Sequence, residues 1–142
     1  MTTRPIREVM TAAPVALSAD TPVVEVARKM RDEDIGAVLV MQNTGQLRGL
    51  VTDRDLAVRI LAEDSENVTT MTALDACSPE VIAVGPDDGT DRAVELMHEY
   101  ALRRLPVVKG DQAIGMVALG DLAVEHDLDS VLGSISAAQP NT

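Results

Sequence analysis

The chain has 142 residues, of which 46% are hydrophobic, and its formal net charge is −11. This length suits one compact domain with a real core and is too short for two large domains. The sequence has no Trp or Phe and a single Tyr, so the core must be aliphatic and no aromatic platform exists for stacking single-stranded bases. The acidic charge repels phosphate backbones, and we expect no nucleic-acid partner, although a small phosphorylated ligand could bind in a local basic pocket.

The sequence predicts a cytoplasmic protein. Its single cysteine, Cys77, cannot form an internal disulfide, as is typical of a reducing compartment. The apolar patch at residues 9–19 superficially resembles a secretory signal, but Pro14 interrupts it and the same segment aligns with residues 76–86. No apolar run approaches the roughly 18 residues that a membrane span needs, so we expect no membrane contact.

In the first half of the chain, the pattern predicts a strand, a helix, two strands and a second helix. A short strand at residues 15–17 precedes a helix capped by Asp20 or Thr21, with Pro22 in its first turn. Apolar residues at helical spacing continue this helix until Gly36 ends it. Strands are predicted at residues 37–41 and 47–51, a second helix from Thr52 or Asp53 to about residue 61, and a connection at residues 62–70.

The second half repeats this order. It predicts strands at residues 81–84, 105–108 and 113–117, and helices at residues 90–100 and 121–126. After them, apolar residues fall on one helical face, which predicts a tail helix that docks on the domain or on a second subunit: Leu128, Val131, Leu132 and Ile135. The last six residues are expected to fray.

The two halves are copies of one unit. Residues 49–58 return as residues 115–124, and the match extends back to Met30 and Met97, which are 67 positions apart. A unit that cannot bury its own apolar face buries it against a neighbour. We therefore divide the chain into a first repeat at residues 6–64, a second repeat at residues 71–126 and a tail at residues 127–142.

The repeats resemble a tandem pair of cystathionine-β-synthase (CBS) domains, the Bateman module. The resemblance covers roughly residues 6–124 and is carried by Met10-Thr11, by the Asp-Thr-Pro helix start, by the segment at residues 102–108, and by Gly-apolar-apolar-Thr-Asp-Arg-Asp-Leu at residues 49–56. In size the chain looks like the stand-alone CBS-pair proteins of actinobacteria of the hypoxic-response type, without an attached enzyme or channel domain.

The resemblance implies an α+β fold. Two β-α-β-β-α repeats would be related by a pseudo-twofold axis, with their sheets packed together and the helices outside. Such pairs often form homodimers, and family members commonly bind adenosine nucleotides or S-adenosylmethionine in two clefts between the sheets.

One cleft has the groups that a nucleotide needs. In a Thr-x-x-Asp helix start, the Asp55 carboxylate can accept ribose hydroxyls, while Thr52 and the free N–H groups face phosphate and Arg54 sits beside them. The family pattern places residues from the other repeat opposite this segment, including two arginines suited to an anion. The facing residues are Leu102, Arg103 and Arg104, with Ser78 and Ile82 beside the base.

The related cleft is poorer. It keeps Asp121, but Ala118 replaces the threonine and Gly120 replaces the arginine. Its remaining residues carry no basic group: Thr11, Val15, Ile35, Gly36 and Ala37. We predict that it holds an adenosine moiety by ribose and base and lacks the phosphate half, so that binding is asymmetric.

Simpler interpretations stay open for each group. The acids after Thr52 could serve only as a helix cap, and the two arginines could pair with surface carboxylates. His98 and His126 read as solvated helix residues, because no metal-spaced cluster accompanies them, and Cys77 reads as a small buried residue.

The functional prediction is a non-catalytic regulatory module that binds AMP, ADP or ATP, with S-adenosylmethionine as another possible ligand. Occupancy would change its own association or that of an unidentified protein partner. The alternative is a ligand-free structural or protein-interaction dimer associated with stress response, with vestigial clefts. An enzyme has little support, because no nucleophile with a spaced base, phosphate loop or metal set is present.

Overall fold

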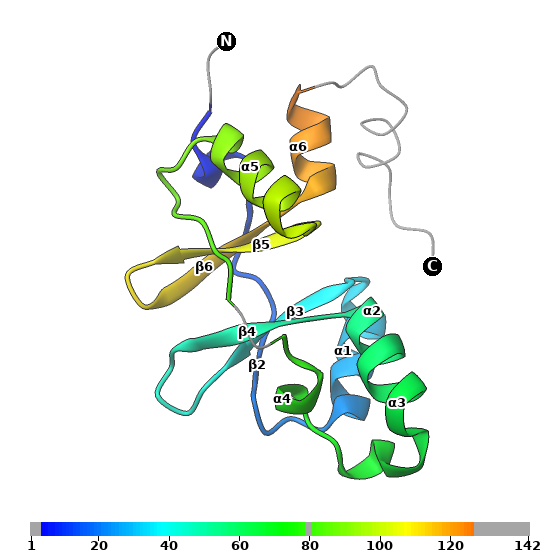
Figure 1. The fold of residues 1–142 in the computed structure, drawn as a ribbon. Helices are drawn as coiled ribbons and strands as arrows, with labels where there is room; N and C mark the ends of the chain where they lie inside the picture. Colours follow the sequence, from blue (N-terminus) through cyan, green and yellow to red (C-terminus); the bar gives the residue numbers. More distant parts are fainter. Residues whose placement is uncertain (1–3, 79–80, 127–142) are drawn as a thin grey trace. The chain divides into compact units, whose positions relative to one another are not determined.

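The computed structural model describes residues 4–78 and 81–126, which form two compact units (Figure 1). The first unit is Val15–Val81. The second unit combines the N-terminal residues up to Pro14 with the chain from Ile82 onward.

The first unit contains a three-stranded sheet in the order β2-β3-β4. Strands β2 (Ala16–Ser18) and β3 (Ala37–Met41) are parallel, and β3 is antiparallel to β4 (Leu47–Thr52). The helical elements are α1 (Val23–Glu33), α2 (Asp53–Asp55), the π-helical η2 (Leu56–Leu61), α3 (Ala62–Asp64), the 3-10 helix η3 (Ser65–Thr70) and α4 (Ala73–Ala76).

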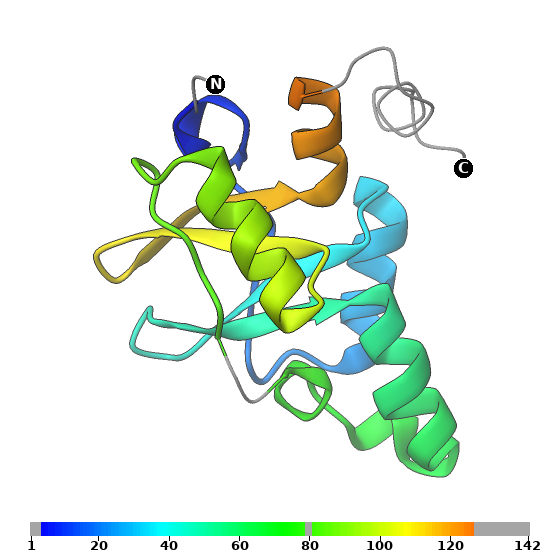
Figure 2. The same ribbon diagram turned by 45° about the horizontal axis from the view of Figure 1, so that its top comes forward.

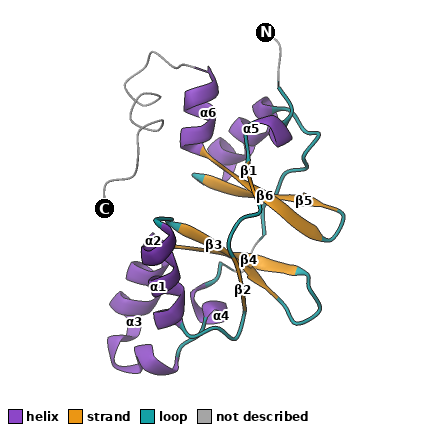
Figure 3. Cartoon of the chain, turned by 180° about the vertical axis from the view of Figure 1, so that it is seen from behind, coloured by secondary structure: helices purple, strands orange, loops and turns teal. Residues whose placement is uncertain are grey.

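The helices of the first unit cover one face of its sheet (Figure 3). Helix α1 is amphipathic, and its buried side chains are Val23, Val26 and Met30. They pack with Val38 and Val40 of β3 and with further apolar side chains of the same core: Val51, Ile60, Ala73, Ala76 and Cys77. Burial of these aliphatic groups is the main force that holds α1 against the sheet.

The second unit contains the sheet β1-β6-β5. Strands β1 (Thr11–Ala12), β5 (Arg104–Lys109) and β6 (Gln112–Ala118) pair antiparallel. Helix α5 (Thr90–Tyr100) lies against the β5–β6 hairpin (Figure 2), and α6 (Leu119–His126) follows β6 directly. A 3-10 helix, η1 (Ile6–Glu8), completes the unit. Its core contains Ile6, Val84, Leu105, Val107 and Val117, with α5 and α6 contributing Ala93, Leu96, Met97 and Leu122.

Each compact unit takes its first segment from the other sequence repeat. Residues 4–12 belong to the second unit, where the fully buried Ile6 donates its N–H to the Asp88 carbonyl at 2.8 Å and Thr11 pairs with Met116. The residue 67 positions later, Ala73, is fully buried in the first unit and donates its N–H to the Thr21 carbonyl at 2.8 Å. The repeats in the sequence and the compact units are therefore two different divisions of the chain.

Two equivalent glycines allow these exchanged segments to approach the sheets. A Cβ at Gly49 of β4 would collide with the Cys77 sulfur, and a Cβ at Gly115 of β6 would collide with the Met10 sulfur. Both strands therefore need a residue without a side chain at this point.

Several sequence predictions are confirmed. The α+β class holds, and the predicted bounds of β3 and α5 match the structure at both ends. Strand β4 is one residue longer than predicted at its C-terminal end, and β5 and β6 are each one residue longer at both ends. The predicted tail helix lies outside the described residues.

The predicted caps of the first helix are wrong. Neither Asp20 nor Thr21 caps α1, because Pro22 occupies the N-cap and the Val23 N–H donates to the Met71 carbonyl at 3.0 Å. A backbone carbonyl from far along the sequence thus accepts the hydrogen bond that a capping side chain was expected to accept. The helix also ends before Gly36, at Glu33, followed by Asp34 in the left-handed conformation with φ 54°.

Two further predictions are corrected. The strand expected at residues 81–84 is reduced to one parallel bridge between Val84 and Val107. This bridge is equivalent to the pairing of Leu17 with Val40 in the first unit. The second unit therefore keeps the same register, but only over one residue pair. The segment at residues 62–70, expected as a plain connection, is helical in α3 and η3, and Val68 and Met71 at its end pack on the first core.

Candidate functional site

A reciprocal pair of hydrogen bonds fixes Asp55 where β4 passes into α2. The Asp55 N–H donates to Thr52 Oγ1 at 3.1 Å, and the Thr52 N–H donates to Asp55 Oδ2 at 2.8 Å. Thr52 has extended backbone angles, so its side chain reaches the first helical turn and the two residues form a capping box. The carboxylate is thereby held at a defined position at the end of a central strand.

The second oxygen of Asp55 has an arginine partner. Arg59 Nε lies 3.3 Å from Asp55 Oδ1, and the Asp55 side chain is 18% exposed against 46% for Arg59. Arg59 lies within the π-helical η2, a type of irregularity that often marks functional positions. Because the guanidinium is largely solvated, this ion pair contributes only about 0.3–0.5 kcal/mol to stability.

Asp121 occupies the equivalent position in the second unit. Its Oδ2 accepts the Ala118 N–H at 2.8 Å, the same distance as in the first unit. Burial raises the pKa of Asp121, and the hydrogen bond from Ala118 only partly opposes this effect. Ala118 has no hydroxyl, so the reciprocal bond of the first unit is missing here.

The loop after the first helix of each unit lies beside the start of the second. The Asp53 N–H donates to the Gly36 carbonyl at 2.9 Å, and the Leu119 N–H donates to the Arg103 carbonyl at 2.8 Å. Arg104 is paired with Ala118 across β5 and β6. Within the second unit, the arginine pair therefore lies near the helix start that carries Asp121.

The predicted nucleotide residues are shared between the two units. The first unit contains Thr52, Arg54, Asp55 and Ser78 together with Val15, Ile35, Gly36 and Ala37. The second unit contains Ile82, Leu102, Arg103 and Arg104 together with Thr11 and Asp121. That Asp55, Arg103 and Arg104 contact the same ligand stays a prediction.

Apolar members of both predicted sets also support the cores. Val15 and Ile35 pack on the first core, and Ile82 and Leu102 pack on the second. Arg54 and Arg103 are exposed, whereas Arg104 is partly buried and has interactions within the protein. A role in packing thus accounts for these apolar positions.

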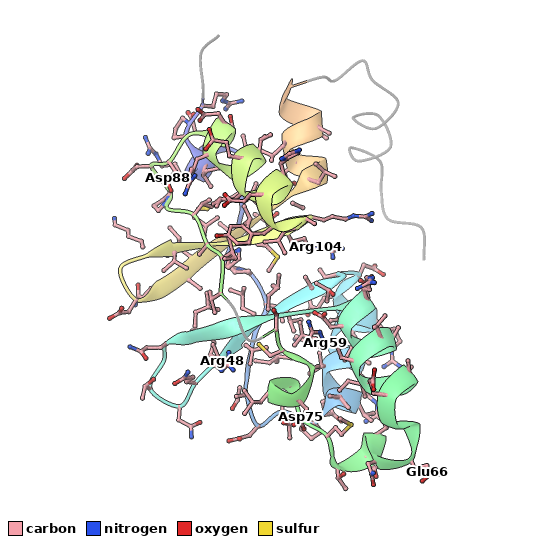
Figure 4. The ribbon with its side chains drawn as sticks, viewed as in Figure 1. Arg48, Arg59, Glu66, Asp75, Asp88 and Arg104 are labelled. Carbon is pink, nitrogen blue, oxygen red and sulfur yellow. The ribbon has the colours of Figure 1, made fainter. Side chains whose placement is uncertain are left out.

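Two arginines that sequence reasoning missed, Arg48 and Arg59, lie in the first unit (Figure 4). Burial raises the pKa of the Cys77 thiol, the charges of Arg48 and Arg59 oppose that shift, and Asp55 adds to it. All three charges therefore act on the same place beside β4. A comparison of the repeats could have found the arginines, because the equivalent residues are Ile114 and Glu125.

Other chemistry has little support in the described part of the chain. Residues 4–78 and 81–126 contain no group of three or more His, Cys, Asp or Glu side chains arranged to hold a metal ion. His98 is exposed on α5 and Cys77 is buried, as the sequence predicts. Among the same residues, no helix has the length and apolar character needed to cross a bilayer.

One family model matches the chain at two places along its length. The model described as "CBS domain" matches residues 6–62 and 73–125. These two matches cover most of the chain and coincide with the internal repeats.

Two proteins of Bacillus subtilis are similar over nearly their whole length. The CBS domain-containing protein YhcV is 33% identical over 129 residues, which are 91% of this chain and 90% of that protein. The protein YlbB is 36% identical over 130 residues, which are 91% of this chain and 86% of that protein. Hypoxic response protein 1 of Mycobacterium tuberculosis is 28% identical over 82% of this chain and 81% of that protein.

Solved structures show the same fold. The crystal structure of Hypoxic Response Protein I with two coordinated zinc ions has a TM-score of 0.77 and 27% identity, and covers 87% of this chain and 98% of that one. The CBS domain pair of protein MJ0100, in complex with 5′-methylthioadenosine and S-adenosyl-L-methionine, has a TM-score of 0.75 at 20% identity, with coverage of 86% and 94%. At that identity the second likeness shows the fold alone.

Proposed function

Because the chain belongs to the CBS domain family as a tandem pair, we propose that it is a non-catalytic regulatory module that binds AMP, ADP or ATP. The ligand is held by the set Thr52, Arg54, Asp55, Ser78, Ile82, Leu102, Arg103 and Arg104, which draws on both repeats. The set Thr11, Val15, Ile35, Gly36, Ala37 and Asp121 is the weaker one. The similarity to Hypoxic response protein 1 supports a place among the CBS pairs of that type.

One observation carries this proposal: the same carboxylate is fixed in the same way in both units. Asp55 and Asp121 each accept a backbone N–H at 2.8 Å through Oδ2. Each is only part-buried, so Oδ1 remains able to accept a hydroxyl from a ligand. A carboxylate with a fixed orientation is well suited to the paired hydroxyls of a ribose.

A ligand that contacts both repeats also provides a signal. It stabilises the arrangement in which ribose, base and phosphate are all contacted, and it shifts the equilibrium by its difference in affinity between arrangements. The complex of the MJ0100 pair with two adenosine derivatives supports adenosine compounds as the ligand class. The transfer of that ligand class to this chain is part of the proposal.

Thermal unfolding with millimolar AMP, ADP, ATP or S-adenosylmethionine tests the proposal. A ligand at about 100 times its Kd adds about 2.7 kcal/mol to the free energy of unfolding. Asp55→Ala should remove most of that gain. The matched control is Asp75→Ala, because Asp75 accepts the Thr72 N–H at 2.8 Å in another capping box but is exposed on α4.

The absence of a melting shift with all four compounds would contradict nucleotide binding. Equal loss of the ligand effect in Asp55→Ala and Asp75→Ala would show that helix capping, and not a ligand contact, explains the result.

A second candidate, a ligand-free dimer, is favoured by one surface of the first unit. Val58 and Leu61 of η2 and Leu74 of α4 are exposed by 42%, 56% and 45%, and these elements pack together. Exposed apolar side chains that are grouped in this way are suited to protein contact. Leu61→Glu should then convert a dimer to a monomer in light scattering after size exclusion, whereas Gln46→Glu in the β3–β4 turn should not.

A further inference from the structure

We infer that Arg59 makes the site around Asp55 selective for phosphorylated adenosine ligands over neutral or cationic ones. The inference rests on the proposed function and adds to it a residue that determines specificity. It adds a guanidinium beside the ribose-binding carboxylate to the phosphate-facing groups of the first unit.

The geometry of the Arg59 side chain supports this role. Its Nε contacts Asp55 Oδ1 at 3.3 Å, and in the part of the chain that the structure describes this is its one hydrogen-bonded partner. A guanidinium has five N–H donors, so the two terminal nitrogens keep four of them for a ligand. Planar, forked donors match the oxygens of a phosphate.

The Arg59–Asp55 pair can rearrange when a ligand arrives. The Arg59 side chain is 46% exposed, so solvent already screens its attraction to the carboxylate. A ribose hydroxyl can therefore replace Nε on Asp55 while the guanidinium turns to the phosphate. Arg59 lies within the π-helical η2, four residues after Asp55.

The first unit holds a second arginine, Arg48, that the sequence reasoning missed. It is part-buried on β4, and the charges of Arg48, Arg59 and Asp55 all reach the Cys77 thiol (Figure 4). The chain as a whole carries a net charge of −11, which opposes the approach of an anion. An anionic ligand would therefore depend on local positive charge, which Arg59 supplies beside Asp55.

The second repeat lacks the same charges. Ile114 stands in place of Arg48, Gly120 in place of Arg54 and Glu125 in place of Arg59. The carboxylate is present in both repeats, whereas basic residues at these three positions occur in the first repeat only. The selectivity for phosphate therefore belongs to Asp55 and not to Asp121.

The test compares AMP with 5′-methylthioadenosine, which shares the adenosine part and has no phosphate. Isothermal titration of the full chain should show tighter binding of AMP. Arg59→Gln should weaken AMP binding about tenfold, the loss expected for a charged hydrogen bond, and leave methylthioadenosine binding unchanged. Arg28→Gln is the control, because Arg28 forms a helical ion pair with Glu25 on α1 that is more exposed than the Arg59–Asp55 pair.

The outcomes distinguish a failure of the proposed function from a failure of the inference about Arg59. If the wild-type chain binds neither compound, the proposed function fails and the inference fails with it. If the wild type binds both compounds and Arg59→Gln keeps the preference for AMP, only the inference is overturned. Arg59→Lys, which keeps the charge, should retain most of the preference.

A measurement on the wild type alone removes any dependence on the folding of the variants. If local arginines bind the phosphate, AMP affinity should fall as salt rises from 50 to about 500 mM, while methylthioadenosine affinity stays constant. The overall negative charge predicts the opposite trend, because salt screens its repulsion of AMP. A rise of AMP affinity with salt would overturn the inference.

Discussion

Asp55 and Asp121 have the same backbone hydrogen bond and different electrostatic surroundings. Each accepts an N–H at 2.8 Å from the residue three positions earlier. Asp55 also contacts a guanidinium, whereas burial alone dominates the environment of Asp121 and raises its pKa. Duplication has therefore preserved the position of the carboxylate, and later substitutions have changed the charge around it.

The difference shows which features of the repeat the fold requires. The backbone contact between the loop after the first helix and the start of the second is present in both units, at 2.9 and 2.8 Å. The side chains on this frame vary between basic, small and acidic residues at the positions of Arg48, Arg54 and Arg59. The frame is thus structural, and the charges are free to define a ligand.

The largest effect is expected from a change in an exchanged segment. Ile6 belongs to the first sequence repeat but is fully buried in the second unit, so Ile6→Ala should cost about 2–5 kcal/mol. Hydrogen exchange should show lost protection in residues 82–126. Ala73→Gly, at the equivalent position, should cost about 1 kcal/mol and affect residues 15–78. A loss of hydrogen-exchange protection that is confined to residues 15–64 in Ile6→Ala would contradict the burial of Ile6 in the second unit.

The next effect concerns the two glycines. Gly49→Ala and Gly115→Ala should each cost about 1–3 kcal/mol, because the added methyl overlaps a sulfur atom. Cys77→Ala should rescue Gly49→Ala, since the removed sulfur makes room for the methyl.

Met10→Ala should rescue Gly115→Ala less well. The new Cβ would also lie 3.0 Å from the Thr11 carbonyl oxygen, whereas at Gly49 the nearest backbone oxygen, of Ser78, lies at 3.3 Å. Equal rescue in thermal unfolding would show that the backbone of β1 adjusts freely.

The smallest effects on stability are expected at the two carboxylates, and they have opposite signs. Asp55→Asn breaks the pair with Arg59 and should cost about 0.5 kcal/mol at pH 7. Asp121→Asn removes a charge that burial disfavours and keeps an acceptor for the Ala118 N–H, so it should raise Tm slightly.

The pH dependence of Asp121 follows from the direction of its shift. A raised pKa means that the folded wild type takes up a proton more readily than the unfolded chain. Wild-type stability therefore gains as pH falls through the raised pKa toward the ordinary value of 3.8, and the advantage of Asp121→Asn should shrink. An advantage that grows on acidification, in melts at pH 7 and about pH 4, would contradict this assignment.

The sequence was sufficient to predict the elements that depend on local pattern. The run of apolar residues in β3 and the helical spacing in α5 are strong periodic signals, and both elements lie where expected. The start of α1 could not be predicted, because its cap is the Met71 carbonyl, which lies far along the chain. The assignment of residues 4–12 to the second unit depends equally on long-range contacts.

The candidate site was predicted in part for a similar reason. The Thr52-x-x-Asp55 pattern is local, and the structure shows the predicted capping box. Arg59 was not predicted to contact Asp55, although the two residues have the i,i+4 spacing of a helical ion pair. The replacement of Arg59 by Glu125 in the second repeat was visible in the sequence but acquires meaning only beside that contact.

The exchanged first segments also determine the order in which the protein can fold during synthesis. The first unit is complete once Val81 has left the ribosome, but Ile6 must wait for β5 and β6 to emerge before it is buried. At ordinary rates of translation this exposure lasts several seconds.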